Sequence, residues 1–222
     1  MKIDGTETQD TSSPWARYGC DPSTDLVDAM LQRYTEKFGN PDVLLITGDH
    51  VGHKISLHRE EATDESYQRV KDNFIVTNDL VKKHFPNTLI LTLLGNNDSK
   101  RHSQAPDTSE KQEFYSFLYD LWFTEMPGNA SLLSDSELKR TFMDGGYYRV
   151  DVTDTLSVLA MNSQYFDNDD EESYQDGEAS RMLDWLETNL KSAANTSRKF
   201  IISDHVYDGT RYNENQMWHT EF

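Results

Sequence analysis

The feature that most constrains the fold is an apolar run that ends abruptly in glycine and aspartate. Residues 43–46 read Val-Leu-Leu-Ile, and Gly48 and Asp49 follow almost at once. The run has no helical period, so it predicts a buried strand that delivers the Asp49 carboxylate at its carboxyl end. Gly48 lets the backbone turn tightly and leaves room for a neighbouring group. With His50 and His53 close behind, the stretch indicates a metal site, although a strand exit whose aspartate caps its own turn has the same pattern.

Two more apolar runs end in polar residues in the same way. Residues 89–94 are followed by a Gly-Asn-Asn-Asp segment that carries Asn96, and residues 200–202 lead to His205. The carboxyl ends of parallel strands lie at one edge of a sheet, where ligands collect. We therefore expect Asp49, Asn96 and His205 to lie close together.

The segments between these runs predict helices that cover a sheet. Helical spacing of apolar residues predicts helices at 27–38, 67–81, 109–121 and 179–190 and another towards residue 222, and residues 145–152 and 156–162 predict a hairpin. Helices alternating with wholly apolar strands indicate parallel strands that are covered on both faces. The fold class predicted from the residues is therefore α/β.

Composition limits the partners and the compartment. The formal net charge of −18 over 222 residues argues against nucleic acid or an anionic membrane as the main partner. No apolar run is long enough to span a membrane, and the first residues do not read as a signal peptide. Cys20 is the only cysteine, so it is a buried thiol or pairs outside this chain. The length fits one domain, 1–222.

Several motifs in this order resemble the calcineurin-like metallophosphoesterases, in particular their acid sphingomyelinase-like phosphodiesterase branch. The motifs are Gly19-Cys20-Asp21, Gly48-Asp49 with His53 four residues later, Gly95-Asn96-Asn97-Asp98, Gly145-Gly146-Tyr147-Tyr148, Met161-Asn162-Ser163 and His205-Val206-x-x-Gly209. The resemblance covers nearly the whole chain from Tyr18. It implies a β-sandwich flanked by helices in four αββα layers.

The resemblance also implies a two-metal phosphoester hydrolase. Asp49 would bridge the metals, Asn96 and His205 would ligate the second one, and Asp98 would orient the Asn96 loop from behind. His53 would contact the substrate phosphate. The metals would be zinc or, as the alternative, manganese, which suit oxygen and imidazole ligands. The substrate would be a small-molecule or lipid phosphoester, and the location would be extracellular, lysosomal or vacuolar.

The sequence departs from the family pattern in two ways that affect the metals. The family's first motif, Asp-x-His, and its last, Gly-His-x-His, are both absent. We therefore expect an incomplete domain, truncated at both ends, in which three ligands cannot close two metal sites. Weak or no stoichiometric metal and little activity are expected, and a non-catalytic binding member of the family is the alternative of another class.

A third departure concerns the expected proton donor. Asn97 occupies the catalytic position where the family has a histidine that protonates the leaving group, and an amide cannot do this. His102 is close in sequence but is interpreted as a surface loop histidine. The Gly-Asn-Asn-Asp segment also resembles endopolyphosphatases of the same superfamily. A phosphate leaving group needs less acid help, so polyphosphate hydrolysis is the alternative activity.

The remaining candidates are given ordinary interpretations. His50, His58, His84 and His219 are expected to be bystanders, with His84 on a solvated helix face beside two lysines. Asn-x-Ser/Thr triplets at Asn129 and Asn195 are acceptor patterns for N-glycosylation and give slight support to a secretory route. A sugar on the third triplet, at Asn97, would block the proposed site.

Overall fold

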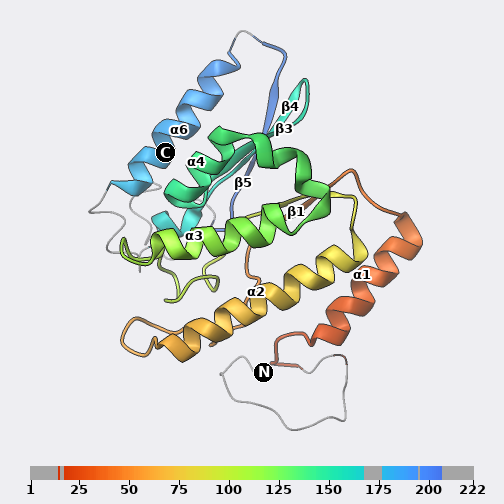
Figure 1. The fold of residues 1–222 in the computed structure, drawn as a ribbon, viewed down its shortest axis with the longest axis vertical. Helices are drawn as coiled ribbons and strands as arrows, with labels where there is room; N and C mark the ends of the chain where they lie inside the picture. The colour runs from red at the N-terminus through yellow and green to blue at the C-terminus, as the bar shows by residue number, and fades with distance from the viewer. Residues whose placement is uncertain (1–14, 16–17, 168–176, 195, 207–222) are drawn as a thin grey trace.

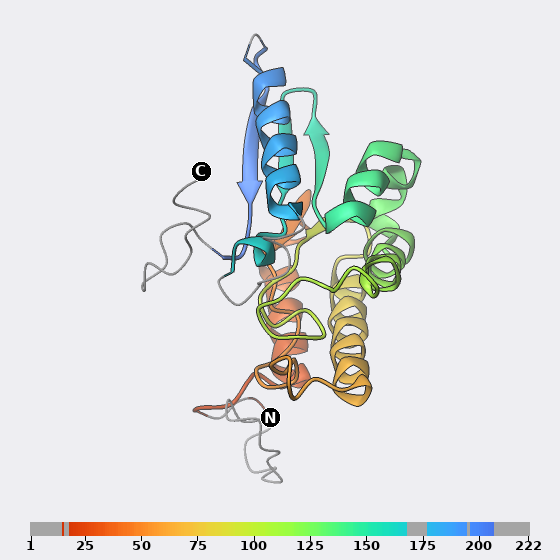
Figure 2. The same cartoon turned by 90° about the vertical axis from the view of Figure 1, so that its left-hand side faces the viewer.

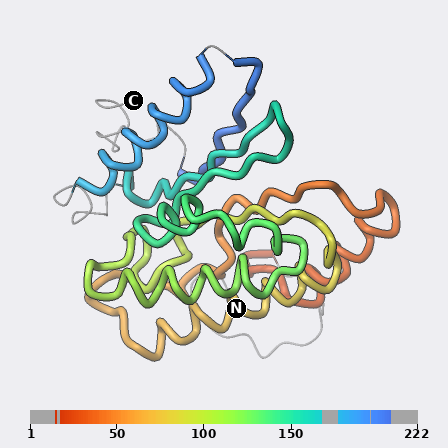
Figure 3. Tube along the Cα trace, turned by 45° about the horizontal axis from the view of Figure 1, so that its top comes forward, coloured from red at the N-terminus to blue at the C-terminus, as the bar shows by residue number. Residues whose placement is uncertain are grey.

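The computed structural model describes residue 15 and residues 18–167, 177–194 and 196–206. It contains helices and two separate sheets, so the prediction of an α/β fold is confirmed. The second sheet and the last helix lie at one end of the molecule, and the first two helices lie at the other (Figures 1 and 3). The helix expected near residue 222 and His219 are outside the described residues.

The first sheet is the parallel pair predicted from the two apolar runs. β1 (Val43–Ile46) pairs with β2 (Leu89–Thr92), with Leu44 opposite Ile90. Two helices alternate with these strands, α1 (Thr24–Phe38) and α2 (Asp64–His84). Ser23 and Thr63 cap the two helices by accepting hydrogen bonds from backbone N–H groups in the first turn.

β1 is less buried than its apolar sequence predicts. Leu45 is 36% exposed, whereas Ile90 and Leu91 of β2 are each 2% exposed. Among the described residues β1 pairs only with β2, so its outer edge is open. The expectation of a fully covered strand is therefore wrong for β1 and right for β2.

The second sheet has the order β3-β4-β5. β3 (Tyr148–Thr153) and β4 (Leu156–Ala160) form the predicted antiparallel hairpin, and β5 (Lys199–Ser203) runs parallel to β4. α6 (Glu178–Ser192) packs on one face through Met182 and Leu186. The other face joins the aromatic core, so helices cover the sheet on both sides (Figure 2).

An aromatic core fills the space between the two sheets. It is built by α3 (Lys111–Tyr119), the π-helix η1 (Asp120–Thr124) and α4 (Ser136–Gly145). Two short 3₁₀ helices complete the fold, η2 (Pro127–Ser134) and η3 (Ser163–Phe166). The core position predicted for the aromatic helix is confirmed, because Phe114 and Leu118 are at most 1% exposed. No described helix combines the length and the apolar character that a membrane crossing requires.

Two of the three glycosylation triplets are buried. Asn129 is 0% exposed, and Asn97 is 2% exposed. The Asn129 side chain accepts a hydrogen bond from the Ile90 N–H at 2.9 Å and donates to the carbonyls of Ile90 at 2.7 Å and Trp122 at 2.8 Å. Asn129 is therefore a structural clamp on β2, and its interpretation as a sugar acceptor is wrong for the folded chain. The Asn195 side chain lies outside the described residues.

Replacing Asn129 by alanine is expected to lower the free energy of unfolding by about 2 kcal/mol, because it leaves buried backbone groups of Ile90 and Trp122 without partners. Urea unfolding followed by circular dichroism measures this. Asn73→Ala is the control, because Asn73 makes only an exposed hydrogen bond within its own helix, to the Arg69 carbonyl. An Asn129→Ala variant as stable as the control would contradict the clamp.

Candidate active site

The three residues predicted to share one edge do meet. Asp49 follows β1, Asn96 follows β2 and His205 follows β5, so both sheets contribute. His205 Nε2 lies 3.0 Å from Asn96 Oδ1 and 3.4 Å from Asp49 Oδ1. The sequence-based expectation that these side chains lie together is confirmed, although they come from positions up to 156 residues apart (205 minus 49).

The orientation of His205 fits these three groups to a cation. Its Nδ1 lies 2.7 Å from the Thr47 carbonyl oxygen, which can only accept, so Nδ1 carries the hydrogen. Nε2 then faces Asn96 Oδ1 and Asp49 Oδ1, and both of these oxygens can only accept. A positive charge at the point that the three atoms face satisfies them together, either as a proton on Nε2 or as a bound cation. An imidazole nitrogen with two oxygens is a donor set that zinc and manganese accept.

Among the described residues, no three His, Cys, Asp or Glu side chains form a group that could hold a metal ion. At this site His205 and Asp49 supply two donors of these types, and the third donor is the amide oxygen of Asn96. The described chain therefore brings three candidate ligands to one point and no closed ligand shell.

Two glycines allow the strand ends to approach each other. A Cβ atom on Gly48 would lie 2.5 Å from the Gly95 nitrogen, and one on Gly95 would lie 2.3 Å from Asp49 Oδ1. Asp49 itself has a φ of 56°, in the left-handed region that non-glycine residues rarely adopt. Backbone in such a conformation is held by its surroundings and is concentrated at functional sites.

Asp98 holds these strand ends from behind. It is 0% exposed, and its carboxylate accepts hydrogen bonds from the Gly95 N–H at 2.8 Å and the Val51 N–H at 3.0 Å. Burial raises the pKa of Asp98 to about 8, with a smaller contribution from the Asp49 charge, while the N–H bonds oppose the shift. It thus contacts the backbone on both sides of the site, as the resemblance implied.

Asn97 supports Asp49 and does not face the substrate side as a donor. Its backbone N–H lies 3.2 Å from Asp49 Oδ1, and its side-chain Nδ2 donates to Asp49 Oδ2 at 3.1 Å. Asn97 Oδ1 is buried without a hydrogen-bond partner and borders a cavity of about 100 Å³. Both of its donors are therefore directed at the carboxylate of Asp49.

His53 and Asp49 border a larger groove of about 440 Å³ beside α1 and α2. The Nδ1 atom of His53 lies 2.8 Å from Asp21 Oδ1, which only accepts while ionised, so Nε2 remains for another partner. The His53 side chain is 53% exposed. Apolar side chains in the groove wall include Val27, Ile55, Val76 and Leu80, and polar ones include Thr24, Asn73 and Thr77. The groove lining is thus mixed.

Two buried residues to which the sequence analysis assigned no role support the site. Ser163 Oγ accepts hydrogen bonds from the backbone N–H groups of His205 at 3.1 Å and Val206 at 2.7 Å. Gln164 Nε2 donates to the Gly95 carbonyl at 2.6 Å. The available signal was a run of polar residues after the apolar segment 156–161, in the motif that carries the resemblance.

Two histidines are placed differently from the sequence interpretation. His102 is not a surface histidine, because its Nε2 lies 3.2 Å from Asn96 Nδ2. His84 is not on a solvated face, because its side chain is 8% exposed and its Nε2 lies 2.6 Å from Asp28 Oδ1. Asp28 is brought to His84 by the packing of α1 on α2, whereas Asn96 meets His102 because the loop between them closes on itself.

His50 and His58 keep their ordinary interpretation. The His50 ring packs between Phe74 and Trp122, and burial lowers its pKa to about 4. A neutral ring between aromatic rings is a core residue. His58 is exposed and lies edge-on to His102, with ring centroids 5.3 Å apart.

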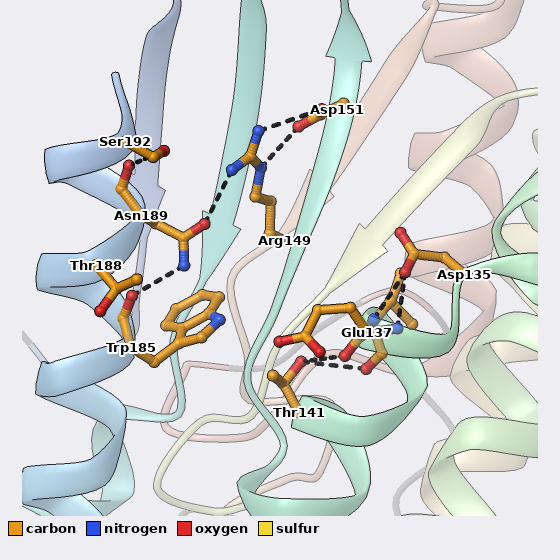
Figure 4. A pocket seen from close by; sticks show the side chains of 10 residues that line it. Asp135, Glu137, Thr141, Arg149, Asp151, Trp185, Thr188, Asn189 and Ser192 are labelled. Atoms are coloured by element: carbon orange, nitrogen blue, oxygen red, sulfur yellow. Dashed lines mark hydrogen bonds and ion pairs between the residues drawn. The ribbon is translucent and has the colours of Figure 1, made fainter. Parts of the chain in front are cut away.

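A further cavity of about 490 Å³ lies between α4, β3 and α6, and it contains none of the predicted site residues (Figure 4). Three polar residues of the cavity wall bind one another: Arg149 donates to Asp151 through Nε at 2.7 Å and to Asn189 through Nη1 at 3.0 Å. The candidate site is therefore the edge at Asp49 and not this larger cavity.

Comparison with known proteins identifies the family. A family model described as calcineurin-like phosphoesterase matches residues 19–221. Sphingomyelin phosphodiesterase B of Dictyostelium discoideum is 25% identical over 198 residues, which cover 88% of this chain and 29% of that protein. Acid sphingomyelinase-like phosphodiesterase 3b of Mus musculus is 23% identical over 221 residues, covering 98% of this chain and 45% of that protein. The chain thus spans less than half the length of these relatives.

Proposed function

As the chain belongs to the calcineurin-like phosphoesterase family, we propose that it carries the active site of a metal-dependent phosphodiesterase that acts on a lipid phosphoester. The observation that carries this proposal is the meeting of Asp49, Asn96 and His205, with Nε2 of His205 directed at both oxygens. A scaffold alone has no need of polar groups at three strand ends. The non-catalytic alternative leaves this convergence unexplained.

Asp49, Asn96 and His205 would hold the metal, with Asp49 as the bridging ligand of a pair. Zinc is the first candidate and manganese the second. When bound, such ions supply electrophilic stabilisation of the phosphate and lower the pKa of a coordinated water. Three ligands are fewer than two closed sites require, so we expect this chain to bind metal weakly and to have low activity.

The chain's own residues would orient the substrate. Asn97 holds both carboxylate oxygens of Asp49 in place. Asp21 fixes the His53 ring by its Nδ1, so Nε2 is available to a phosphate oxygen when the ring is protonated. Asp98 keeps the two strand ends together. These are positioning roles, and the proton for the leaving group has to come from a group other than Asn97.

The groove favours a lipid over polyphosphate. Val27 of α1 and Val76 and Leu80 of α2 form an apolar part of its wall, which suits the acyl part of a lipid. Asp21 and Asp49 in its lining, together with the formal net charge of −18, would repel a polyanion. Polyphosphate remains the second candidate because Asn97 lacks a transferable proton, and a phosphate leaving group needs least protonation. The names of the relatives support an extracellular, lysosomal or vacuolar location.

The test is hydrolysis of sphingomyelin, bis(p-nitrophenyl) phosphate and polyphosphate, each with added zinc, added manganese or a chelator. We expect slow, metal-dependent cleavage of the first two and none of the third. Polyphosphate cleavage alone would favour the second candidate. Bound metal without hydrolysis of any of the three would favour the non-catalytic alternative and contradict the proposal.

A further inference from the structure

The amide of Asn96 has two ends of similar shape and opposite hydrogen-bonding character. Its oxygen can ligate a cation, whereas its NH₂ group would repel one. In the structure the oxygen lies 3.0 Å from His205 Nε2, and the nitrogen lies 3.2 Å from His102 Nε2. What sits at the nitrogen end therefore decides which atom faces the site.

His102 is held in place by the backbone around it. Its N–H donates to the Leu57 carbonyl at 2.9 Å, and the next residue, Ser103, donates its N–H to the Asn96 carbonyl at 2.8 Å. The loop from Asn96 to Ser103 is thus closed on itself, and Leu57 and Arg101 form a parallel bridge across it. These bonds fix the backbone of His102 beside Asn96, so the ring starts from a position next to the Asn96 amide.

We propose that His102 is a positioning residue: its Nε2 accepts a hydrogen bond from Asn96 Nδ2 and so fixes the Asn96 oxygen towards His205 and Asp49. The opposite amide orientation would place NH₂ against the His205 lone pair and remove one of three candidate ligands. This inference rests on the proposed function, because it explains how one ligand of that site is oriented. Partners of this kind behind a metal ligand typically contribute about 10- to 100-fold in affinity.

The first test uses the metal-free protein and no activity. The hydrogen bond requires the His102 tautomer with its hydrogen on Nδ1 and a lone pair on Nε2. Long-range ¹H–¹⁵N NMR of the imidazoles, measured with a chelator at a pH where the ring is neutral, distinguishes the two tautomers. We expect the Nδ1–H form for His102. An Nε2–H form would overturn the proposal, whether or not the chain binds metal.

The second test measures Mn²⁺ affinity from the paramagnetic broadening of NMR signals near Asn96, which detects weak binding. His102→Leu removes the acceptor and is expected to weaken Mn²⁺ binding about tenfold. His102→Gln restores an acceptor oxygen and is expected to recover part of this loss. His58→Leu is the matched control, because His58 borders the same small cavity without a hydrogen bond to Asn96. Circular dichroism checks that all three variants fold.

The outcomes separate the two proposals. Unchanged Mn²⁺ affinity in His102→Leu, or an equal loss in His58→Leu, would overturn the role of His102 while leaving the metal site standing. A wild-type chain that binds no Mn²⁺ would contradict the proposed function, and the NMR tautomer would still decide the orientation of Asn96.

Discussion

The Asp49→Asn variant is expected to bind zinc or manganese more than about 100-fold more weakly than the wild type, because it replaces the charged ligand by a neutral amide with a single acceptor oxygen, a larger change than the loss of a supporting partner. The charge that attracts the cation is lost. Both carboxylate oxygens now accept hydrogen bonds from Asn97, and an asparagine has only one acceptor oxygen. One N–H donor of Asn97 would therefore face another donor. Any metal-dependent hydrolysis is expected to fall with the metal affinity.

Asparagine is the right substitution because it changes the metal ligand and keeps the backbone conformation. Asp49 has a φ of 56°, and asparagine tolerates that conformation better than most residues. The backbone turn after β1 is therefore expected to survive. The measurement is calorimetric titration of metal, with thermal unfolding of the chelated protein as the check on folding.

Asp21→Asn is the matched control for Asp49→Asn. Asp21 is a carboxylate at the same groove, but its hydrogen bond goes to His53 and not to Asn96 or His205. We expect this variant to keep the wild-type metal affinity. Equal affinities for wild type and Asp49→Asn would remove Asp49 from the metal site.

The strand ends were predictable because their cause is local. An apolar run followed by polar residues specifies where a strand stops, which marked Asp49, Asn96 and His205. Parallel pairing of β1 with β2 brings Asp49 and Asn96 together, whereas His205 reaches them from β5 of the second sheet. Asp98 and Asn97 were also marked by their position in the Gly-Asn-Asn-Asp segment, although the sequence did not indicate that Asn97 would bind Asp49.

The features that could not be predicted depend on contacts between distant segments. His84 reads as a solvated helix residue until α1 brings Asp28 against it. Asn129 reads as a glycosylation triplet until β2 lies beside it. Ser163 and Gln164 acquire roles only because their segment is folded against His205 and Gly95. Local patterns carry no information about such partners.

Replacing Asp98 by asparagine is expected to lower the free energy of unfolding of the metal-free protein by about 2 to 3 kcal/mol near pH 5. Both oxygens of Asp98 accept backbone N–H groups, from Val51 and Gly95. In the variant one of these buried donors faces an amide NH₂ instead. Asp42→Asn, at an exposed residue, is the control for the loss of a carboxylate.

The same pair of proteins tests the shifted pKa of Asp98. Burial raises its pKa in the folded state to about 8, above the usual value of 3.8, so between these two values the folded wild type binds one proton more than the unfolded chain. The wild type should then lose stability as the pH rises through this window, by at most about 1.4 kcal/mol per pH unit. Asparagine does not titrate, so the stability advantage of wild type over Asp98→Asn should shrink from about pH 5 to about pH 8. Urea unfolding with a chelator present measures this difference and cancels the titration of other groups. A difference that grows with pH would mean that Asp98 is ionised and stabilised by its two N–H bonds, and that these bonds outweigh the cost of its burial.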